Sequence, residues 1–454
     1  MNSSSLQLDT GYRQILALAL PISLALVIPF LNVTVNNYFL GQLGESELGT
    51  AGITSVFYLI VAVIGNGLNS ALQSLISRKA GEDNRTAIGI YFGQGIRIAL
   101  LFSILAIAVS YFVVPSLFNV MLKQKEVRET AVEFIFVRIW GLPFLYLYQS
   151  GNALLVGTTN ARFLAIGTLA QAGSNIVLDY LFIFGHAGFP ELGFQGAAWA
   201  SVFSEIIGML VVLIIIIGKK LHLQFGLFSQ LKPKRSETSQ ILTTSAPLIL
   251  QYSISLISWF IFYSLLEHRG ERALAISNIM RNVFILCGIF TWAFGSATNT
   301  LVSNTIGQKK EHEVLPLLYR MMQLSFLFAF GLSLLLNLFS YQCLGLFGMP
   351  ESFIREAEPV LRMVTAGVLL MSISITALNA ITGTGNTTMN LIAEIAAIVV
   401  YIIYCFYVIE WNYLGLSVAW ASELVYWAII LSIALSYMRS DRWKKTNSAS
   451  RGEV

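Results

Sequence analysis

Ten polar side chains, five of them ionisable, lie inside stretches of sequence that are otherwise apolar. The ionisable residues are Asp179, Glu205, Arg281, Glu394 and Glu423, and the uncharged ones are Asn36, Gln149, Asn175, Gln251 and Asn282. Such groups are costly in lipid unless they face a cavity or a partner, and in membrane proteins they mark ion and substrate pathways. These residues therefore favour the transport of ions or charged compounds.

Asn175 and Asp179 are the most specific pair among them. They are four residues apart, so on a helix both project from one face. Together they offer a carboxylate and an amide carbonyl, which are ligands that hard cations such as sodium prefer. Two alternatives stay open, since a buried carboxylate can instead carry a proton, and Asp179 can simply cap or hydrogen-bond a neighbouring helix.

A second candidate group lies in the C-terminal half of the chain. Glu394 and Glu423 would attract cationic compounds inside a cavity of low dielectric constant. Tyr401 and Trp420 would offer aromatic faces to the same cations. Gln251 and Arg281 complete this predicted substrate cavity. The structural alternative is that Arg281 neutralises one of the two glutamates as an ion pair.

The composition places these residues in an all-α polytopic membrane protein. Of the 454 residues, 56% are hydrophobic and 11% are charged, and soluble domains carry roughly 25% charged residues. This balance excludes a disordered chain, a nucleic-acid-binding domain and a disulfide scaffold, and Cys287, Cys343 and Cys405 are expected to be packing residues. We predict twelve spans, at about 15–40, 50–77, 88–114, 132–156, 162–184, 194–217, 241–266, 275–305, 315–338, 357–382, 388–409 and 415–438.

The basic residues of the loops predict the orientation. Seventeen Lys and Arg residues fall on the side of the N-terminus and six on the other, so both termini are expected in the cytoplasm of a bacterial cell, with the protein in the inner membrane. The predicted parts are a cytoplasmic tail at 1–14, an N-lobe at 15–217, a cytoplasmic linker at 218–240, a C-lobe at 241–438 and a basic cytoplasmic tail at 439–454 that anchors the chain beside anionic lipid. The first span is expected to be retained rather than cleaved as a signal peptide.

An internal repeat relates the two lobes. A shift of 226 residues aligns Pro21 with Pro247, Ser70-Ala71 with Ser296-Ala297, and Gly157-Thr158-Thr159-Asn160 with Gly383-Thr384-Gly385-Asn386. Each lobe has six spans, an even number, so we expect parallel repeats about a pseudo-two-fold axis along the membrane normal. The two Gly-Thr-x-Asn turns are predicted to end one helix and start the next, rather than to hold phosphate.

Two prolines, Pro21 and Pro29, lie in the first span. Each removes a helix hydrogen bond, so they are candidate hinges at which this span bends during a transport cycle. The structural alternative is that they serve only packing.

The order of several motifs resembles the multidrug and toxic compound extrusion (MATE) transporters of the MOP flippase superfamily. The matching stretches are Phe39-Leu40-Gly41-Gln42-Leu43-Gly44, Gly157-Thr158-Thr159-Asn160, Asn175-Ile176-Val177-Leu178-Asp179-Tyr180 with Ile183-Phe184-Gly185, and Gly193-Phe194-Gln195-Gly196-Ala197-Ala198-Trp199-Ala200-Ser201. The resemblance covers nearly the whole chain.

The resemblance implies a cation site in the N-lobe. Related members build it from an aspartate late in the first span, an Asn-x-x-x-Asp pair on the fifth and a hydroxyl on the sixth. Asn175 and Asp179 match the pair, Ser201 looks like the hydroxyl, and Asn36 stands where the first aspartate is expected. Since an amide cannot take up a proton but can offer its carbonyl to a metal cation, the coupling ion is predicted to be sodium, with a proton as the alternative.

These observations predict a cation-coupled antiporter, active as a monomer among membrane lipids, that exports amphipathic and often cationic small molecules by alternating access. No enzyme activity, cofactor or nucleic-acid partner is expected. The alternative within the superfamily is a flippase for lipid-linked oligosaccharides, which the scarcity of deep Arg and Lys residues disfavours. A passive channel or a membrane-embedded enzyme is the alternative from another class.

Overall fold

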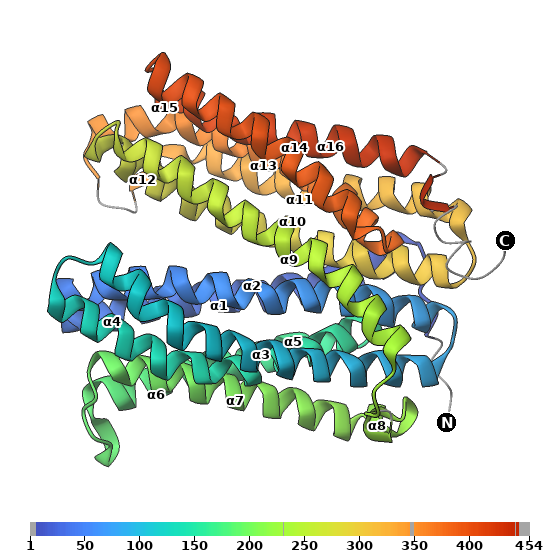
Figure 1. The fold of residues 1–454 in the computed structure, drawn as a ribbon. Coiled ribbons are helices and arrows are strands. Elements are labelled where there is room, and N and C mark those ends of the chain that lie inside the picture. The colour runs from blue at the N-terminus through green and yellow to red at the C-terminus, as the bar shows by residue number, and fades with distance from the viewer. Residues whose placement is uncertain (1–5, 230, 346–348, 441, 445–454) are drawn as a thin grey trace. The chain divides into compact units, whose positions relative to one another are not determined.

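The computed structural model describes residues 6–229, 231–345, 349–440 and 442–444, and the regular structure in those residues is helical throughout (Figure 1). The helices are α1 (Tyr12–Leu43), α2 (Glu45–Gly81), α3 (Arg85–Met121), α4 (Lys125–Arg138), η1 (Ile139–Gly141), α5 (Leu142–Gly157), η2 (Ala161–Phe163), α6 (Leu164–Phe184), η3 (His186–Gly188), α7 (Phe194–Gly218), α8 (Leu221–Gln224), η4 (Leu227–Ser229), α9 (Arg235–Glu267), α10 (Glu271–Gly307), η5 (Glu311–Glu313), α11 (Val314–Leu338), α12 (Ser340–Gly345), α13 (Glu351–Thr384), α14 (Thr387–Cys405), η6 (Phe406–Trp411), α15 (Leu416–Trp420) and α16 (Ser422–Arg439). Residues 1–5 of the predicted N-terminal tail and residues 441 and 445–454 of the predicted basic tail lie outside the described residues.

All twelve predicted spans appear as helices or helix pairs, which confirms the fold class. Eleven of them are long and apolar enough to cross a membrane. The remaining one is α6, whose 21 residues reach about 31 Å at 1.5 Å per residue. Its hydropathy is lower because it carries Gln171, Asn175 and Asp179, two of which are predicted cation ligands.

The backbone repeats the 226-residue offset that the sequence predicts. Four pairs of residues related by this offset all have positive φ, although the residue types differ in three of the pairs. The pairs are Gly44 and Gly270 (φ 151° and 92°), Asp83 and Lys309 (52° and 63°), Thr159 and Gly385 (66° and 89°), and Ala187 and Tyr413 (54° and 48°). The repeat is therefore one of backbone conformation, retained where the side chains have diverged.

The turn between α13 and α14 has the role predicted for it. Gly385 takes a left-handed conformation (φ 89°) directly after α13, and the Asn386 side chain accepts a hydrogen bond from the Met389 backbone N–H. Because a glycine ends one helix and an asparagine caps the next, only two residues are needed to connect these two helices.

The chain packs as two compact units that share two helices. Unit 1 contains Leu6 and Leu24–Ile249, and unit 2 contains Gln7–Ser23 and the described residues from Leu250 onward. The boundaries fall inside α1 and α9, two residues after Pro21 and Pro247. The predicted lobes are continuous segments of the sequence, whereas each of these units combines two separate segments that pack together. The first half of α1 therefore belongs to unit 2, and the first half of α9 belongs to unit 1.

Hydrogen bonds hold the N-terminal segment in unit 2. The Leu8 backbone N–H donates to Asn304 Oδ1 at 2.9 Å, and Arg320 donates to the Thr10 carbonyl at 2.9 Å. The segment therefore contacts residues that lie about three hundred positions later in the chain.

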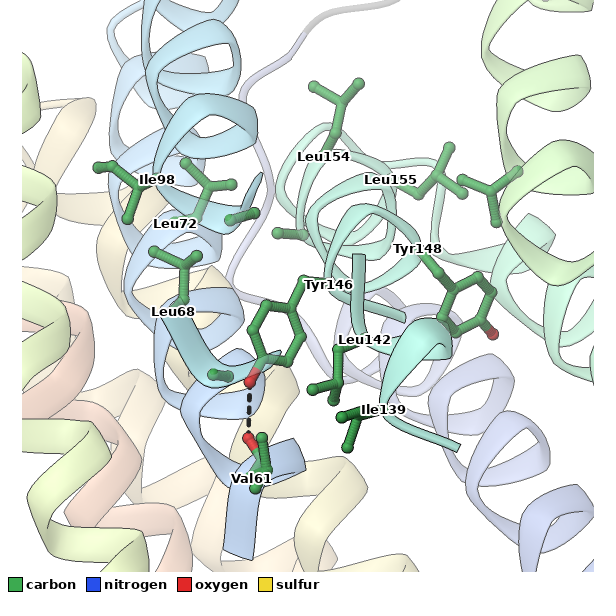
Figure 2. Close-up of a cluster of buried hydrophobic side chains, with 14 of the residues drawn as sticks. Val61, Leu68, Leu72, Ile98, Ile139, Leu142, Tyr146, Tyr148, Leu154 and Leu155 are labelled. Carbon is green, nitrogen blue, oxygen red and sulfur yellow. Dashed lines mark hydrogen bonds between the residues drawn. The ribbon is translucent and has the colours of Figure 1, made fainter. Parts of the chain in front are cut away.

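The core of unit 1 forms where α2, α3 and α5 meet. Figure 2 shows Tyr146 of α5 pointing toward α2, where its hydroxyl donates to the Val61 carbonyl at 2.7 Å. Gly65 permits this approach, because a Cβ there would lie 2.6 Å from the Tyr146 ring. Leu68 and Leu72 fill the space beside the ring, so these helices form a fixed framework.

The end of the predicted linker is fixed to α3. Gln94 is fully buried, and its side chain donates to the Lys232 carbonyl at 2.8 Å and accepts from the Lys234 N–H at 3.2 Å and from the Thr238 hydroxyl at 3.1 Å. Tyr91, one turn earlier on α3, donates to Gln240. The linker is thus an ordered part of unit 1 in its described residues.

Candidate functional site

An asparagine cluster joins α1 to α6 in unit 1. Asn32 and Asn36 lie four residues apart on α1, and their amide groups both donate to Asn175 Oδ1 of α6, at 2.8 and 3.1 Å. Two of the predicted ligands, Asn36 and Asn175, are therefore in contact. Asn32 was not predicted, although its spacing from Asn36 places it on the same helix face and could have identified it.

Asp179 lies one turn beyond this cluster on α6. It shares a helix face with Asn175, which Asn36 of α1 bonds, and its neighbour Tyr180 has its ring centroid 6.4 Å from that of Phe39. Asp179 is 1% exposed, and neither of its carboxylate oxygens has a hydrogen-bond partner in the described part of the chain. The prediction that Asp179 caps or bonds a neighbouring helix therefore has no contact to support it.

The unpartnered atoms of this site are four oxygens and one nitrogen, Asn175 Nδ2. Besides the two of Asp179, the Oδ1 atoms of Asn32 and Asn36 are buried without a partner among the described residues. Buried polar atoms are nearly always hydrogen-bonded, so four unsatisfied oxygens on two helices that are joined through Asn175 favour a compensating group. A carboxylate with two amide carbonyls is a ligand set for a hard cation. We call Asn32, Asn36, Asn175 and Asp179 the amide–carboxylate site.

The structure gives Asn175 and Ser201 different surroundings from those predicted. The Asn175 carbonyl oxygen is occupied by two amide donors, so it orients Asn32 and Asn36 and is not free for an ion. Ser201 lies half-buried on α7, and its backbone carbonyl accepts from the Ser204 hydroxyl at 2.8 Å. No described hydrogen bond joins the Ser201 hydroxyl to the amide–carboxylate site.

A buried ion pair lies in the same unit. Arg138 donates to both carboxylate oxygens of Glu205, with Nη2–Oε1 at 2.7 Å and Nη1–Oε2 at 2.9 Å. Tyr58 donates its hydroxyl to Glu205 Oε1 at 2.8 Å and places its ring 3.7 Å from the Arg138 Cζ. Glu205 is one of the predicted polar residues but had no predicted role, and Arg138, well inside the span predicted at 132–156, was not predicted.

The local fold explains the position of Arg138. Pro143 cannot donate a backbone hydrogen bond, and the fourth span breaks just before it into α4, the three-residue η1 and α5. Arg138 is the last residue of α4, where the helix dipole favours a cation. Gly141 leaves room for the pair, since a Cβ there would lie 1.9 Å from Glu205 Oε2.

No described ion pair or hydrogen bond reaches the Asp179 carboxylate. Since the charge of Glu205 is already compensated by Arg138, the group Asp179, Glu205 and Arg138 carries one net negative charge. One added positive charge at Asp179 would balance this group.

Glu394 of α14 is enclosed by hydrogen-bond donors in unit 2. It is 1% exposed and accepts from the Ser255 hydroxyl, from the Tyr426 hydroxyl at 2.5 Å and from Gln251 Nε2 at 3.3 Å. Gln251 therefore contacts Glu394 as predicted, whereas Ser255 and Tyr426 were not assigned. All three donors are neutral, so no described cation compensates this carboxylate.

Glu423 and Arg281 are not an ion pair. Glu423 is 2% exposed and accepts from Trp427 Nε1 at 3.0 Å, whereas Arg281 is exposed on α10 and lies 5.4 Å from the Tyr263 ring centroid. No ion pair within the described residues joins Arg281 to a glutamate. The alternative in which Arg281 neutralises Glu394 or Glu423 is therefore wrong.

Tyr401 and Trp420 are core residues in this conformation. They are 2% and 0% exposed, and each packs against Phe262, at ring-centroid distances of 6.1 and 5.3 Å. The Trp420 indole N–H donates to the Ser277 hydroxyl at 3.1 Å. Neither residue presents an open aromatic face to a cation here.

The repeat places no second copy of the amide–carboxylate site in unit 2. At the 226-residue offset, Asn36 and Asn175 correspond to Phe262 and Tyr401, whose rings are in contact, and Asp179 corresponds to Cys405. Apolar packing thus replaces the polar ligands, so the two units are alike in backbone and different in chemistry.

Comparisons with known proteins agree with this architecture. A family model described as MatE matches residues 21–181 and again 247–407, which is the offset of the predicted repeat. A probable multidrug resistance protein NorM from Thermotoga maritima is 24% identical over 446 residues, which cover 97% of this chain and 95% of that protein.

Solved structures share the fold. A crystal structure of MATE in the bent conformation matches with a TM-score of 0.89 at 20% identity, covering 99% of this chain and 100% of that one. An outward-facing multidrug resistance MATE family transporter of the MOP superfamily matches with a TM-score of 0.88 at 19% identity, covering 98% of both. Because the family model covers more than half of the residues, the chain belongs to the MatE family, the MATE transporters that its motifs resemble.

Proposed function

We propose that this chain exports amphipathic, often cationic compounds across the bacterial inner membrane, driven by a cation that binds at Asp179. The observation that carries the proposal is the group of buried, unpartnered oxygens of Asn32, Asn36 and Asp179. The relatives named as multidrug resistance proteins support the substrate class. Both termini are proposed to be cytoplasmic and the active form a monomer.

The charge of the site favours a singly charged ion. One net negative charge remains at Asp179 once Arg138 compensates Glu205, so a sodium ion or a proton would neutralise it. We propose sodium, because the two amide carbonyls have no donor and would ligate a metal ion, whereas a proton would use only the carboxylate. Asn175 would hold these amides in place through its two hydrogen bonds.

Transport would follow from alternating access. An ion or a substrate shifts an equilibrium between two conformations only by its difference in affinity for them. We propose that ion binding at Asp179 and substrate binding favour different conformations, with bending of α1 at Pro21 or Pro29. A flippase is disfavoured because the buried arginine, Arg138, is already bound to Glu205 and is not free for a pyrophosphate.

The choice of ion is tested by efflux from proteoliposomes at fixed pH. We expect efflux of a cationic dye to collapse when sodium is replaced by choline, since choline is too large for the amide–carboxylate site. A protonophore should have no effect while the sodium gradient is held. Efflux that survives in choline and stops with the protonophore would assign the proton instead, and leak without any gradient would indicate a channel.

Glu394 gives a prediction about substrate charge. The Glu394→Gln variant keeps the shape of the side chain and the two contacts that Oε1 accepts from Ser255 and Tyr426, but it removes a buried negative charge that has only neutral partners. We expect it to weaken export of cationic compounds at least several-fold more than export of neutral ones. The matched control is Glu351→Gln, at an exposed residue paired with Arg355. Equal loss for both kinds of compound would contradict a role in substrate charge selection.

A further inference from the structure

Three basic residues from two separate segments meet at Gln94 of α3 in unit 1. Gln94 is fully buried, and its Oε1 atom accepts from Arg97 Nη1 at 3.0 Å and from the Lys234 backbone N–H at 3.2 Å. Its Nε2 atom donates to the Lys232 carbonyl at 2.8 Å. One buried amide therefore holds the end of the linker beside an arginine of α3. We call Arg97, Lys232 and Lys234 the α3–linker basic site.

No carboxylate compensates this site. No ion pair within the described residues involves any of its three members. The sequence of α3 contains no Asp or Glu, and neither does the chain between Glu205 and Glu237. Arg97 is exposed, and its hydrogen bond to Gln94 is the only one that it makes in the described structure, so most of its five N–H donors remain available to a ligand. Such a site fits an anion, and phosphate is one that a guanidinium binds well.

The exposed apolar surface of α3 shows how deep Arg97 lies in the membrane. The large apolar residues of α3 that are exposed begin at Leu100, and none precedes it on this helix. From Leu100 to Val120 the helix rises about 30 Å, which is the thickness of the hydrocarbon core of a bilayer. Arg97 lies three residues before this band. It is therefore placed at the level of the lipid headgroups.

We propose that the α3–linker basic site binds the phosphate headgroup of an anionic phospholipid whose acyl chains lie along Leu101 and Ile104. These two residues follow Arg97 by four and seven positions, so all three share one helix face, and they are 63% and 62% exposed. The α3 helix begins on the side of the N-terminus, so in the proposed orientation this lipid belongs to the cytoplasmic leaflet, where anionic headgroups attract basic residues.

A lipid at this site would also bind the start of α9. That helix begins at Arg235, directly after Lys234, and its first half belongs to unit 1. The lipid would thus add a contact between α3 and α9 to the one that Gln94 provides. This role is separate from the proposed ion and substrate sites, so the inference does not depend on them.

The experiment measures lipid binding to the purified full-length protein in a neutral detergent. The readout is the rise of the melting temperature with phosphatidylglycerol, and phosphatidylcholine with the same acyl chains is the reference. We expect a larger rise with phosphatidylglycerol in the wild type. Arg97→Gln removes the charge and can still donate to Gln94, so we expect the apparent affinity for phosphatidylglycerol to fall at least roughly fivefold while the response to phosphatidylcholine stays the same.

Arg85→Gln is the matched control on the same helix. Arg85 pairs with Asp83 in the turn before α3 and lies fifteen residues before the exposed band, so its affinity for phosphatidylglycerol should equal that of the wild type. An equal rise with the two lipids in the wild type would overturn the inference, and so would wild-type affinity in Arg97→Gln. The same rise with glycerol phosphate, which has no acyl chains, would overturn the lipid assignment in favour of a soluble phosphate.

A second variant covers the case in which Arg97→Gln does not yield folded protein. The Lys232 and Lys234 side chains make no hydrogen bond in the described structure, so Lys232→Gln/Lys234→Gln removes two charges without breaking a contact. We expect its affinity for phosphatidylglycerol to fall at least several-fold. Lys123→Gln/Lys125→Gln, at exposed lysines beyond the other end of α3, is its control and should keep wild-type affinity. Unchanged affinity in the Lys232→Gln/Lys234→Gln variant would overturn the proposal.

Discussion

Replacing Asp179 with asparagine is expected to abolish gradient-driven export while the protein remains folded and inserted. The substitution keeps the size of the side chain and removes the charge that a bound cation would neutralise. Because both carboxylate oxygens lack a partner in the described structure, no hydrogen bond is lost. Stability without ions should therefore be equal to or higher than that of the wild type, since an unpaired buried charge is removed. Drug resistance of cells and efflux from proteoliposomes measure the first effect, and melting without sodium measures the second.

Asp83→Asn is the matched control for this variant. Asp83 lies in the exposed turn before α3 with φ 52°, a conformation that asparagine also tolerates. Its ion pair with Arg85, at 3.7 Å, is exposed and contributes little. We expect normal export from this variant. Normal resistance in cells that contain wild-type amounts of the Asp179→Asn protein would contradict the coupling role.

Gly196→Ala is expected to destabilise unit 1 strongly. Gly196 lies in the first turn of α7, where α6 and α7 run side by side (Figure 1). An added Cβ would lie 2.6 Å from both the carbonyl carbon and the carbonyl oxygen of Phe182, which are backbone atoms of α6. Backbone cannot rotate away as a side chain can, so we expect a loss of about 1–3 kcal/mol or more. A lower melting temperature would be accompanied by weaker sodium binding, because Phe182 is three residues from Asp179.

Gly173→Ala makes the same chemical change on α6 where there is room for it. Nothing lies within 4 Å of a Cβ at Gly173, so alanine should be neutral or stabilise the helix by roughly 0.5–1 kcal/mol. Comparing the melting temperatures of the two variants shows whether the close backbone contact at Gly196, or the loss of a glycine in itself, lowers stability. Equal melting temperatures would refute the explanation by backbone contact.

The sequence was informative where a property depends on neighbours along the chain. Long apolar runs predicted the spans. The 226-residue offset predicted the repeat, and the structure confirms it at positions such as Thr159 and Gly385, which both have positive φ. The spacing of Asn175 and Asp179 predicted one helix face, because helical geometry alone fixes which residues share it. The glycine and asparagine between α13 and α14 predicted the turn because their own backbone and capping preferences are local.

Contacts between distant segments could not be predicted in this way. Arg138 and Glu205 are 67 residues apart, and only the packing of the fourth span against α7 reveals that they meet. Arg281 was a reasonable partner for a glutamate by charge, yet helix rotation directs it toward Tyr263. The same limit applies to Glu394, whose donors come from α9 and α16.

The division of α1 and α9 between the compact units has a consequence for biosynthesis. A ribosome makes Gln7–Ser23 before Leu24–Ile249, but this segment belongs to unit 2, and its partners Asn304 and Arg320 are made some three hundred residues later. Unit 1, by contrast, is complete once Ile249 has been made, and it can pack while translation continues. The first half of α1 is therefore made before Leu24–Ile249 but packs after them, and a nascent chain arrested after Ile249 would hold a completed unit 1 preceded by a half-helix whose partners have not yet been made.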